Sequence, residues 1–523
     1  VYGYYNIPKL FGLQDTGSME SSGILQVREN SDLKLDGSGV LIGFVDTGID
    51  YAGSIFLKQD GTTRVTAIWD QTIPAGSPIR LPVQPELPET LENITRTPEG
   101  FLYGSEFTHE QLNAAVKMED AYEGISSRDE NGHGTFLASI AAGNELPDGS
   151  FTGAAPKADI AMVKLKPAKN RLRAYYQIKE DAVAYQENDI MFGISFALEC
   201  ARQLQMPLVI CIGLGNNQGT HQGKNPLALY MDSVTRNPQT AVTVAAGNEG
   251  NSRRHYMGEI RPQERNVTVE MRVGEEERGF FVEFWGSSLY LYRVRLQSPS
   301  GEILDVSTIR GTGTQTLSFV FVETKVEVGY SAIELQSGST LIFFRFISPV
   351  AGIWRFLVYS ESLDTVEFHM WLPVHTTFRT ETYFLEPSPY NTVTNPGDSE
   401  DSITVTAYDN RDQSLYLEAS RGYTPNGVVK PDLAAPGVLL TGPGSQGRYV
   451  QRSGTSVAAA QTAGAVALLM EWAVVRKNAP YLNGTSAKNY LTRAAARDEG
   501  LTYPNPDWGY GRLDLYRVFE LLT

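Results

Sequence analysis

Runs of apolar residues alternate with helix-period segments over most of the chain, and this alternation restricts the possible folds more than any other feature. A run that is apolar at odd and even positions alike predicts a strand buried on both faces, as in a parallel sheet covered by helices. Such strand, helix, strand repeats predict an α/β domain with a doubly wound, mostly parallel sheet. The expected strands are Val40–Val45, Ile160–Leu165, Leu208–Ile212, Ala241–Ala246 and Ile403–Ala407, and the expected helices are His133–Ala142, Asp189–Leu204, Leu227–Val234 and Ser456–Val475.

A different pattern occupies residues 252–401. Short alternating segments are separated by turn sequences such as Ser298–Gly301 and Ser348–Gly352, and helical periodicity is absent. This pattern predicts an all-β sandwich inserted into the α/β domain. We therefore divide the chain into an N-terminal segment (1–19), a discontinuous α/β domain (20–251 and 402–523) and the inserted sandwich (252–401). The expected sandwich strands are Val267–Val273, Phe280–Trp285, Leu289–Leu296, Thr316–Val322, Leu341–Ile347 and Trp354–Tyr359.

Charge and cysteine content exclude several classes of protein. The net charge is −16 and no Lys/Arg-rich run occurs, which argues against nucleic acid as a partner. The longest apolar stretch, Ala463–Val475, is interrupted by Glu471 and is too short to span a bilayer, so we expect no membrane insertion. The two cysteines, Cys200 and Cys211, are expected on a helix and the following strand as buried free thiols.

Asp46 ends the first apolar run, in the sequence Leu-Ile-Gly-Phe-Val-Asp-Thr-Gly. In open α/β sheets, functional sites form at the carboxyl ends of the strands. Asp-Thr-Gly also matches the aspartic proteases, but their chemistry needs two carboxylates that share a proton, and no second such motif follows. By itself Asp46 is equally well explained as a turn residue.

His133 stands out among the six histidines because glycines flank it, in Asn-Gly-His-Gly-Thr, and a helix of small residues follows. A bound group can approach such a ring closely. A lone histidine is more often structural than catalytic, so the catalytic interpretation of His133 depends on the flanking glycines and the helix that follows.

Ser456 lies where Ser-Gly-Thr gives way to an Ala-rich helix. The unpaired N–H groups and positive dipole end of a helix N-terminus stabilise the oxyanion that forms when a serine attacks a carbonyl. The alternative is that Thr455 or Ser456 serves only as an N-cap.

Taken together, these three motifs resemble those of the subtilases, the subtilisin-like serine proteases of peptidase family S8. The likeness covers roughly residues 20–251 and 402–523 and includes the ending Asp507–Asp514. The resemblance implies a subtilisin-type sheet and a serine endopeptidase whose catalytic triad is Asp46, His133 and Ser456. Its substrate is a polypeptide, and its chemistry requires no cofactor.

The same resemblance implies further site residues. Asn248 would donate a hydrogen bond to the oxyanion, together with the backbone N–H of Ser456. Substrate would pair as an added strand with one segment, and a second segment would form the other wall of the pocket for the residue before the scissile bond. Small residues on both walls predict a roomy pocket. The two segments are Gly213, Leu214 and Gly215, and Ala245, Ala246 and Gly247.

Some features point to one branch of the family. Where many subtilases have Met and Pro after the nucleophile, this chain has Val457 and Ala460. These residues, the inserted sandwich and the segment Ile68–Thr72 resemble the Csp germination proteases of spore-forming Clostridia, in which a jelly-roll domain interrupts the protease core. That likeness implies a bacterial, secreted or spore-associated enzyme, made as a zymogen with an N-terminal prodomain, that cleaves a precursor protein during germination. The chain begins at Val1, and we expect a propeptide junction near it.

Two questions stay open from the sequence. Some relatives in this branch are pseudoproteases, so a binding or signalling protein that uses the sandwich is the alternative; the intact triad argues against it. Family members often bind structural calcium, but no loop here has calcium-ligand spacing, so no metal site is assigned.

Overall fold

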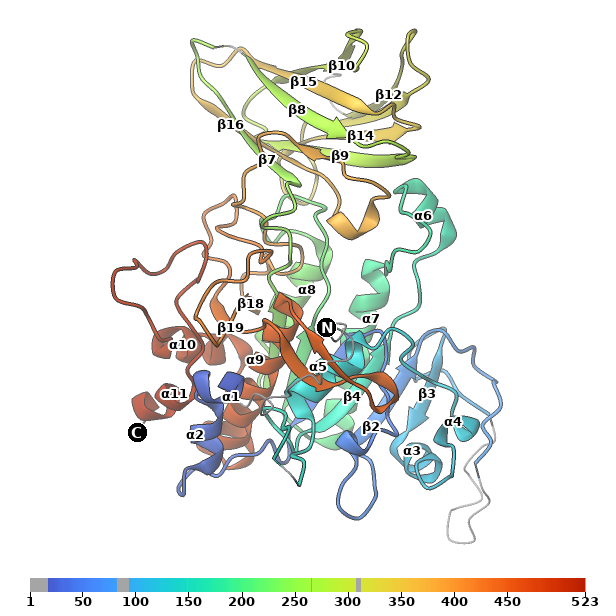
Figure 1. Ribbon diagram of the computed structural model, residues 1–523, viewed down its shortest axis with the longest axis vertical. Coiled ribbons are helices and arrows are strands. Elements are labelled where there is room, and N and C mark those ends of the chain that lie inside the picture. The colour runs from blue at the N-terminus through green and yellow to red at the C-terminus, as the bar shows by residue number, and fades with distance from the viewer. Residues whose placement is uncertain (1–16, 82–93, 148, 265, 307–311, 523) are drawn as a thin grey trace, which may run out of the picture.

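The computed structural model describes residues 17–81, 94–147, 149–264, 266–306 and 312–522. It has two parts: a lower part in which helices surround a sheet, and an upper part made of strands (Figure 1). The N-terminal segment 1–19 lies almost entirely outside the described residues, so what was expected of it stays a prediction.

The lower part is built on a sheet with eight described strands in the order β19-β18-β6-β5-β1-β4-β2-β3. All neighbours are parallel except β2 and β3. Because β1 lies inside the sheet and later strands add on both of its sides, the sheet is doubly wound, as predicted. Its strands are β1 (Leu41–Asp46), β2 (Val65–Asp70), β3 (Ser105–Thr108), β4 (Asp159–Lys164), β5 (Leu208–Ile212), β6 (Thr240–Ala245), β18 (Ile403–Tyr408) and β19 (Leu433–Pro436).

Helices cover both faces of this sheet, which explains the continuous apolar runs. All six residues of β1 are buried. Ile42 and Phe44 pack in the core with α5 (His133–Ala142) and α9 (Thr455–Met470), whereas Leu41 and Val45 pack in the core with α7 (Glu187–Leu204) and α8 (Pro226–Thr235). The expected helix His133–Ala142 has the observed bounds, and α7 and α8 begin or end within two residues of prediction.

Helix α9 is the central helix of the domain, and all of its residues are buried. The segment Thr455–Val475 is long and apolar enough to cross a membrane, but most of it is buried inside the fold. The sequence predicts one helix to Val475; instead, α-helical geometry ends at Met470 and a π-helical turn, Glu471–Val475, follows. There the buried Glu471 carboxylate accepts hydrogen bonds from the backbone N–H groups of Asp36 (2.8 Å) and Gly37 (2.7 Å).

The upper part contains two antiparallel sheets packed face to face around an aromatic-rich core. In the described residues the strand orders are β12-β13-β14-β9-β16-β7 and β11-β10-β15-β8-β17. The strands are β7 (His255–Ile260), β8 (Asn266–Val273), β9 (Gly279–Gly286), β10 (Tyr292–Gln297), β11 (Ile303–Val306), β12 (Thr312–Ser318), β13 (Lys325–Ser331), β14 (Thr340–Ile347), β15 (Gly352–Ser360), β16 (Val366–Trp371) and β17 (Tyr383–Phe384).

One expected sandwich strand, Thr316–Val322, is wrong in its second half. β12 ends at Ser318, and the side chains of Val320 and Phe321 are 83% and 75% exposed. The carboxylate of Glu302 accepts hydrogen bonds from the backbone N–H groups of both residues, which holds a turn there instead of a strand.

Helix α6 (Asn170–Tyr175) links the two parts. Arg345 on β14 donates a hydrogen bond from Nε to the carbonyl of Tyr175 (2.6 Å), and the Tyr175 ring stacks on Phe343 at 6.2 Å between centroids. The sandwich is therefore docked on the α/β domain. The remaining elements are α1 (Gly17–Ser21), α2 (Ile24–Glu29), α3 (His109–Ala115), α4 (Ala121–Gly124), α10 (Gly484–Ala494), α11 (Leu515–Leu522), the hairpin strands β20 (Leu440–Pro443) and β21 (Tyr449–Arg452), and the short 3₁₀ turns Ser54–Phe56, His375–Thr377 and Ser445–Gly447.

Candidate active site

The three residues singled out by sequence motifs meet at one edge of the parallel sheet. Asp46 is the last residue of β1, His133 the first of α5, and Ser456 the second of α9. His133 Nδ1 lies 2.8 Å from Asp46 Oδ1, and His133 Nε2 lies 3.2 Å from Ser456 Oγ. The side chains therefore form one hydrogen-bonded row.

The buried carboxylate of Asp46 orients the imidazole. Asp46 is 1% exposed, and its Oδ1 accepts hydrogen bonds from the backbone N–H of Thr47 (2.7 Å) and from His133. Its Oδ2 is buried without a hydrogen-bond partner among the described residues. An N–H on Nδ1 that faces the carboxylate leaves Nε2 as an acceptor for the hydroxyl of Ser456.

Asp129 holds this arrangement together, and the sequence analysis missed it. Its Oδ1 accepts hydrogen bonds from Thr47 Oγ1 (2.8 Å) and the Gly132 N–H (2.8 Å). Its Oδ2 accepts from the N–H (2.9 Å) and Oγ1 (2.7 Å) of Thr135. Asp129 thus ties the end of β1 to both sides of His133. The signal in the sequence was an aspartate three residues before a glycine, a combination typical of turns. In the structure that glycine, Gly132, has a φ of 79°, which glycine adopts without strain.

Two opposing effects act on the pKa of His133. Burial of the ring disfavours the imidazolium and lowers the pKa, whereas the charge of Asp46 and its hydrogen bond raise it. The net effect places the pKa above its ordinary value of 6.5. The site therefore stabilises a proton on this ring more than water does.

Ser456 begins a helix whose first N–H groups have no partner within the helix. Nearby, Asn248 Oδ1 accepts hydrogen bonds from the N–H and Oγ1 of Thr455, both at 3.1 Å. A Cβ at Gly454 would lie 3.4 Å from Asn248 Nδ2 and 3.6 Å from Ser456 Oγ, so these two atoms flank the bare face of Gly454. The Asn248 Nδ2 group and the Ser456 N–H can both donate to an oxygen placed beside Ser456 Oγ.

The two segments expected to bind substrate leave β5 and β6 beside this row. A Cβ on Gly213 would lie 3.1 Å from His133 Cε1 and 3.2 Å from Ser456 Cβ, so only glycine leaves this space open. Leu214 and Gly215 continue from it. On the other wall, Ala245 ends β6, Ala246 follows, and the N–H of Gly247 donates to Thr455 Oγ1 (3.0 Å).

Thr394 lies between these walls and narrows the pocket that their small residues allow. A Cβ on Gly215 would lie 3.0 Å from Thr394 Cβ, and one on Gly247 would lie 2.6 Å from Thr394 Cγ2. The N–H of Thr394 donates to the carbonyl of Ala246 (2.9 Å), which fixes this buried residue in place. Thr394 follows the last sandwich strand, β17, in sequence, so neither wall segment indicated it.

Other reactive groups lie away from this row. Cys200 on α7 and Cys211 on β5 are buried free thiols, as predicted, and burial raises the pKa of both to about 12. Across the five ranges that the structure describes, no three side chains of His, Cys, Asp or Glu gather as a metal-ligand set.

Comparisons with known proteins agree with this geometry. The sequence profile of the subtilase family, peptidase S8, matches residues 37–271 and 386–511. A solved structure of the CspB protease of Clostridium perfringens is 31% identical in sequence, with a TM-score of 0.82, over 97% of this chain and 98% of that one.

Curated relatives match a shorter region. The membrane-bound transcription factor site-1 protease of Mus musculus is 36% identical over 140 residues, which is 26% of this chain and 13% of the mouse protein. The subtilisin-like protease SBT6.1 of Arabidopsis thaliana is also 36% identical over 140 residues, 25% of this chain and 13% of the plant protein. The aligned region thus spans about an eighth of the length of these relatives.

The opposing effects of burial and of the Asp46 charge predict how the pKa of His133 changes when Asp46 loses its charge. In the native protein the imidazole should titrate above pH 6.5, and in Asp46→Asn below 6.5, because burial then outweighs the remaining attractions. NMR of the His133 Cε1 proton, assigned by its loss in His133→Gln, measures both midpoints. Equal midpoints in the two proteins would show that Asp46 does not set this pKa.

Proposed function

Because the chain belongs to the subtilase family of serine proteases, we propose that it is an endopeptidase in which Ser456, His133 and Asp46 form the catalytic triad. The observation that carries this proposal is the hydrogen-bonded row from the Asp46 carboxylate through the imidazole to Ser456 Oγ. Polypeptides are the substrates of this family.

The chemistry follows from the groups in the row. Ser456 Oγ attacks the carbonyl carbon of the scissile peptide bond while His133 Nε2 takes its proton. Asp46 stabilises the resulting imidazolium, and the raised pKa of His133 agrees with that role. His133 then gives the proton to the leaving amine, and an acyl-enzyme remains. Water, deprotonated by His133, hydrolyses the acyl-enzyme and regenerates Ser456.

Charge on the carbonyl oxygen is stabilised by Asn248 Nδ2 and the backbone N–H of Ser456. Both donors are held before substrate arrives, since Thr455 fixes the orientation of the Asn248 amide. Substrate pairs with Gly213–Gly215, and the side chain before the scissile bond enters between that segment and Ala245–Gly247. The proposed reaction uses these protein groups and no cofactor.

Ser456→Ala should abolish hydrolysis of peptide substrates and labelling by a fluorophosphonate reagent. Asn248→Ala should keep the labelling site but lower kcat by about 10²–10³-fold, because one oxyanion donor is lost. Steady-state kinetics and mass spectrometry of the labelled protein measure both effects. A folded native protein that neither labels nor cleaves any peptide would favour the pseudoprotease.

Thr394 should restrict the residue before the scissile bond to small side chains. In peptides that differ only at this position, Ala should be preferred over Leu. Thr394→Gly should raise kcat/KM for the Leu peptide relative to the Ala peptide by about tenfold, because a methyl group and a hydroxyl no longer fill the pocket. The ratio within each variant controls for changes in folding. An unchanged ratio would mean that Thr394 does not line this pocket.

The likeness to the Csp germination proteases supports two finer proposals: the enzyme arises from a zymogen by cutting off its own prodomain, and it activates a precursor of a spore cortex hydrolase. It would then act as a secreted or spore-associated bacterial protein without inserting into the membrane. Expression of the complete reading frame should yield a processed product that Ser456→Ala lacks. Identical, uncut products from both would contradict self-processing, and an intact hydrolase precursor after incubation with active enzyme would contradict the germination role.

A further inference from the structure

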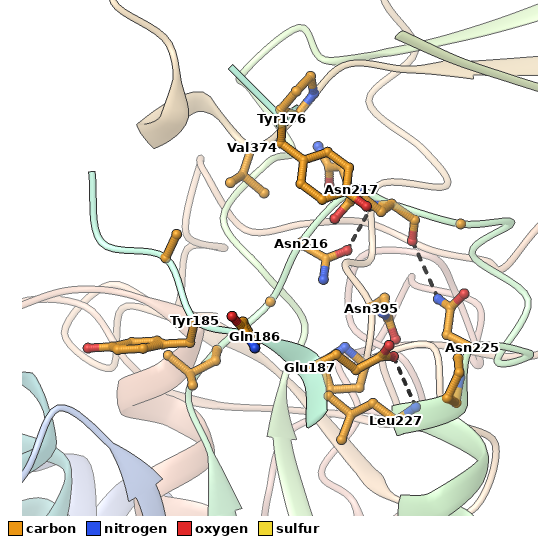
Figure 2. A pocket seen from close by; sticks show the side chains of 18 of the residues that line it. Tyr176, Tyr185, Gln186, Glu187, Asn216, Asn217, Asn225, Leu227, Val374 and Asn395 are labelled. Carbon is orange, nitrogen blue, oxygen red and sulfur yellow. Dashed lines mark hydrogen bonds between the residues drawn. The ribbon is translucent and has the colours of Figure 1, made fainter. Parts of the chain in front are cut away.

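A cavity of about 620 Å³ lies between the α/β domain and the sandwich. From the α/β domain it is lined by Leu214 to Thr220 and by Tyr185 to Asn188; from the sandwich, by Phe281, Glu283 and Trp285 of β9. In Figure 2, Asn216 and Asn217 lie between Tyr176 and Val374 at one end and Gln186 and Glu187 at the other. The cavity therefore continues directly from the segment that begins at Gly213.

Two buried polar residues line this space from opposite domains. Glu283 is 6% exposed; its Oε2 accepts hydrogen bonds from the Gly219 N–H (2.8 Å) and from Trp285 Nε1 (2.9 Å). Asn217 is 2% exposed; its Nδ2 donates to the carbonyl of Leu372 (3.1 Å), and its buried Oδ1 has no partner in the part of the chain that the structure describes. Buried polar atoms in folded proteins normally have partners, so the Asn217 Oδ1 leaves one acceptor of the cavity wall unsatisfied.

Glu283 is the buried charge of the cavity. Burial raises its pKa to about 6, so it carries a negative charge at neutral pH at an energetic cost. Each of the other charged groups along the wall has its own hydrogen-bond partners or is exposed to solvent. Arg173 donates to the carbonyls of Lys179 and Glu180, and Glu334 accepts hydrogen bonds from the backbone N–H groups of Gln336 and Ser337. Glu187 is exposed and accepts from the Leu227 N–H, and Lys224 is exposed. A cation that entered would offset the cost of burying Glu283.

The walls suit a long side chain that ends in a cation. Leu214, Tyr176 and Trp285 contribute apolar surface to the wall of the cavity, and the methylene stems of Lys and Arg pack well on such surface. A guanidinium has five N–H donors and an ammonium has three, so either group can donate hydrogen bonds to the Glu283 carboxylate.

The distance of the cavity from Ser456 determines which residue of a bound substrate can place its side chain in the cavity. Gly213 lies against Ser456, and the four further residues that lead to Asn217 span at most about 13 Å. A peptide paired with Gly213–Gly215 has the residue before the scissile bond near Gly213. Its residues three to five positions before the scissile bond then lie beside the cavity.

We propose that this cavity is a substrate subsite for an Arg or Lys side chain three to five residues before the scissile bond, with Glu283 of the inserted sandwich as its charge partner. This inference rests on the proposed endopeptidase function. It assigns the sandwich a direct part in substrate choice.

Peptide series with Arg, Lys, norleucine or Glu at each of these positions test the proposal. Norleucine keeps the apolar stem without the charge. At the correct position, the native enzyme should cleave the Arg peptide with a kcat/KM about tenfold or more above the norleucine peptide, as expected for a charge-assisted hydrogen bond. Glu283→Gln should reduce this ratio to about one. Glu259→Gln, an exposed site on β7 outside the cavity, should keep the native ratio.

Each other outcome has a definite meaning. If the native enzyme cleaves no peptide of any series, the proposed function itself fails. If it cleaves all peptides but shows no preference for Arg or Lys, or if the preference persists in Glu283→Gln, the subsite is wrong. If free agmatine changes the cleavage rate of the native enzyme but not that of Glu283→Gln, and no peptide is preferred, the cavity binds a free amine. This outcome too would overturn the substrate assignment.

Discussion

The parallel pairing of β1 with β4 and β5 is the constraint on which the rest of the molecule depends. Every residue of β1 is buried, so the strand forms only if helices cover both of its faces and parallel strands flank both of its edges. In a parallel sheet the carboxyl ends of the strands lie along one edge. That edge brings Asp46, Gly213 and Ala245 together, although they are far apart in the chain. Hydrophobic burial thus determines where the polar site lies.

Burial alone does not aim the imidazole of His133, because a side chain at the start of a helix has several rotamers. The carboxylate of Asp46 removes this freedom through its hydrogen bond with Nδ1, and Asp129 holds Thr47 and the backbone on both sides of the histidine. The row from Asp46 to Ser456 is therefore held before substrate binds. Such preorganisation costs nothing at the moment of reaction, which is the condition for efficient electrostatic catalysis.

The chain separates the groups proposed for chemistry from those proposed for substrate choice. The candidate triad and Asn248 all belong to the α/β domain. Thr394, which narrows the pocket beside Gly215, lies on the segment that returns from the sandwich, and Glu283 lies on the sandwich itself. An insertion can therefore change substrate choice while the parallel sheet and its hydrogen-bonded row stay the same.

The sequence by itself determined the class of fold, because apolar runs mark strands buried on two faces. It also gave the candidate triad, because the motifs around Asp46, His133 and Ser456 together resemble those of the subtilases. It also indicated the sandwich, although strands such as β13, whose alternating Val326 and Val328 are buried, were not recognised. Only the tertiary structure decided how the walls of the site are filled. Contacts of that kind join residues more than a hundred positions apart, and no local pattern records which side chain a distant segment will place in a given space.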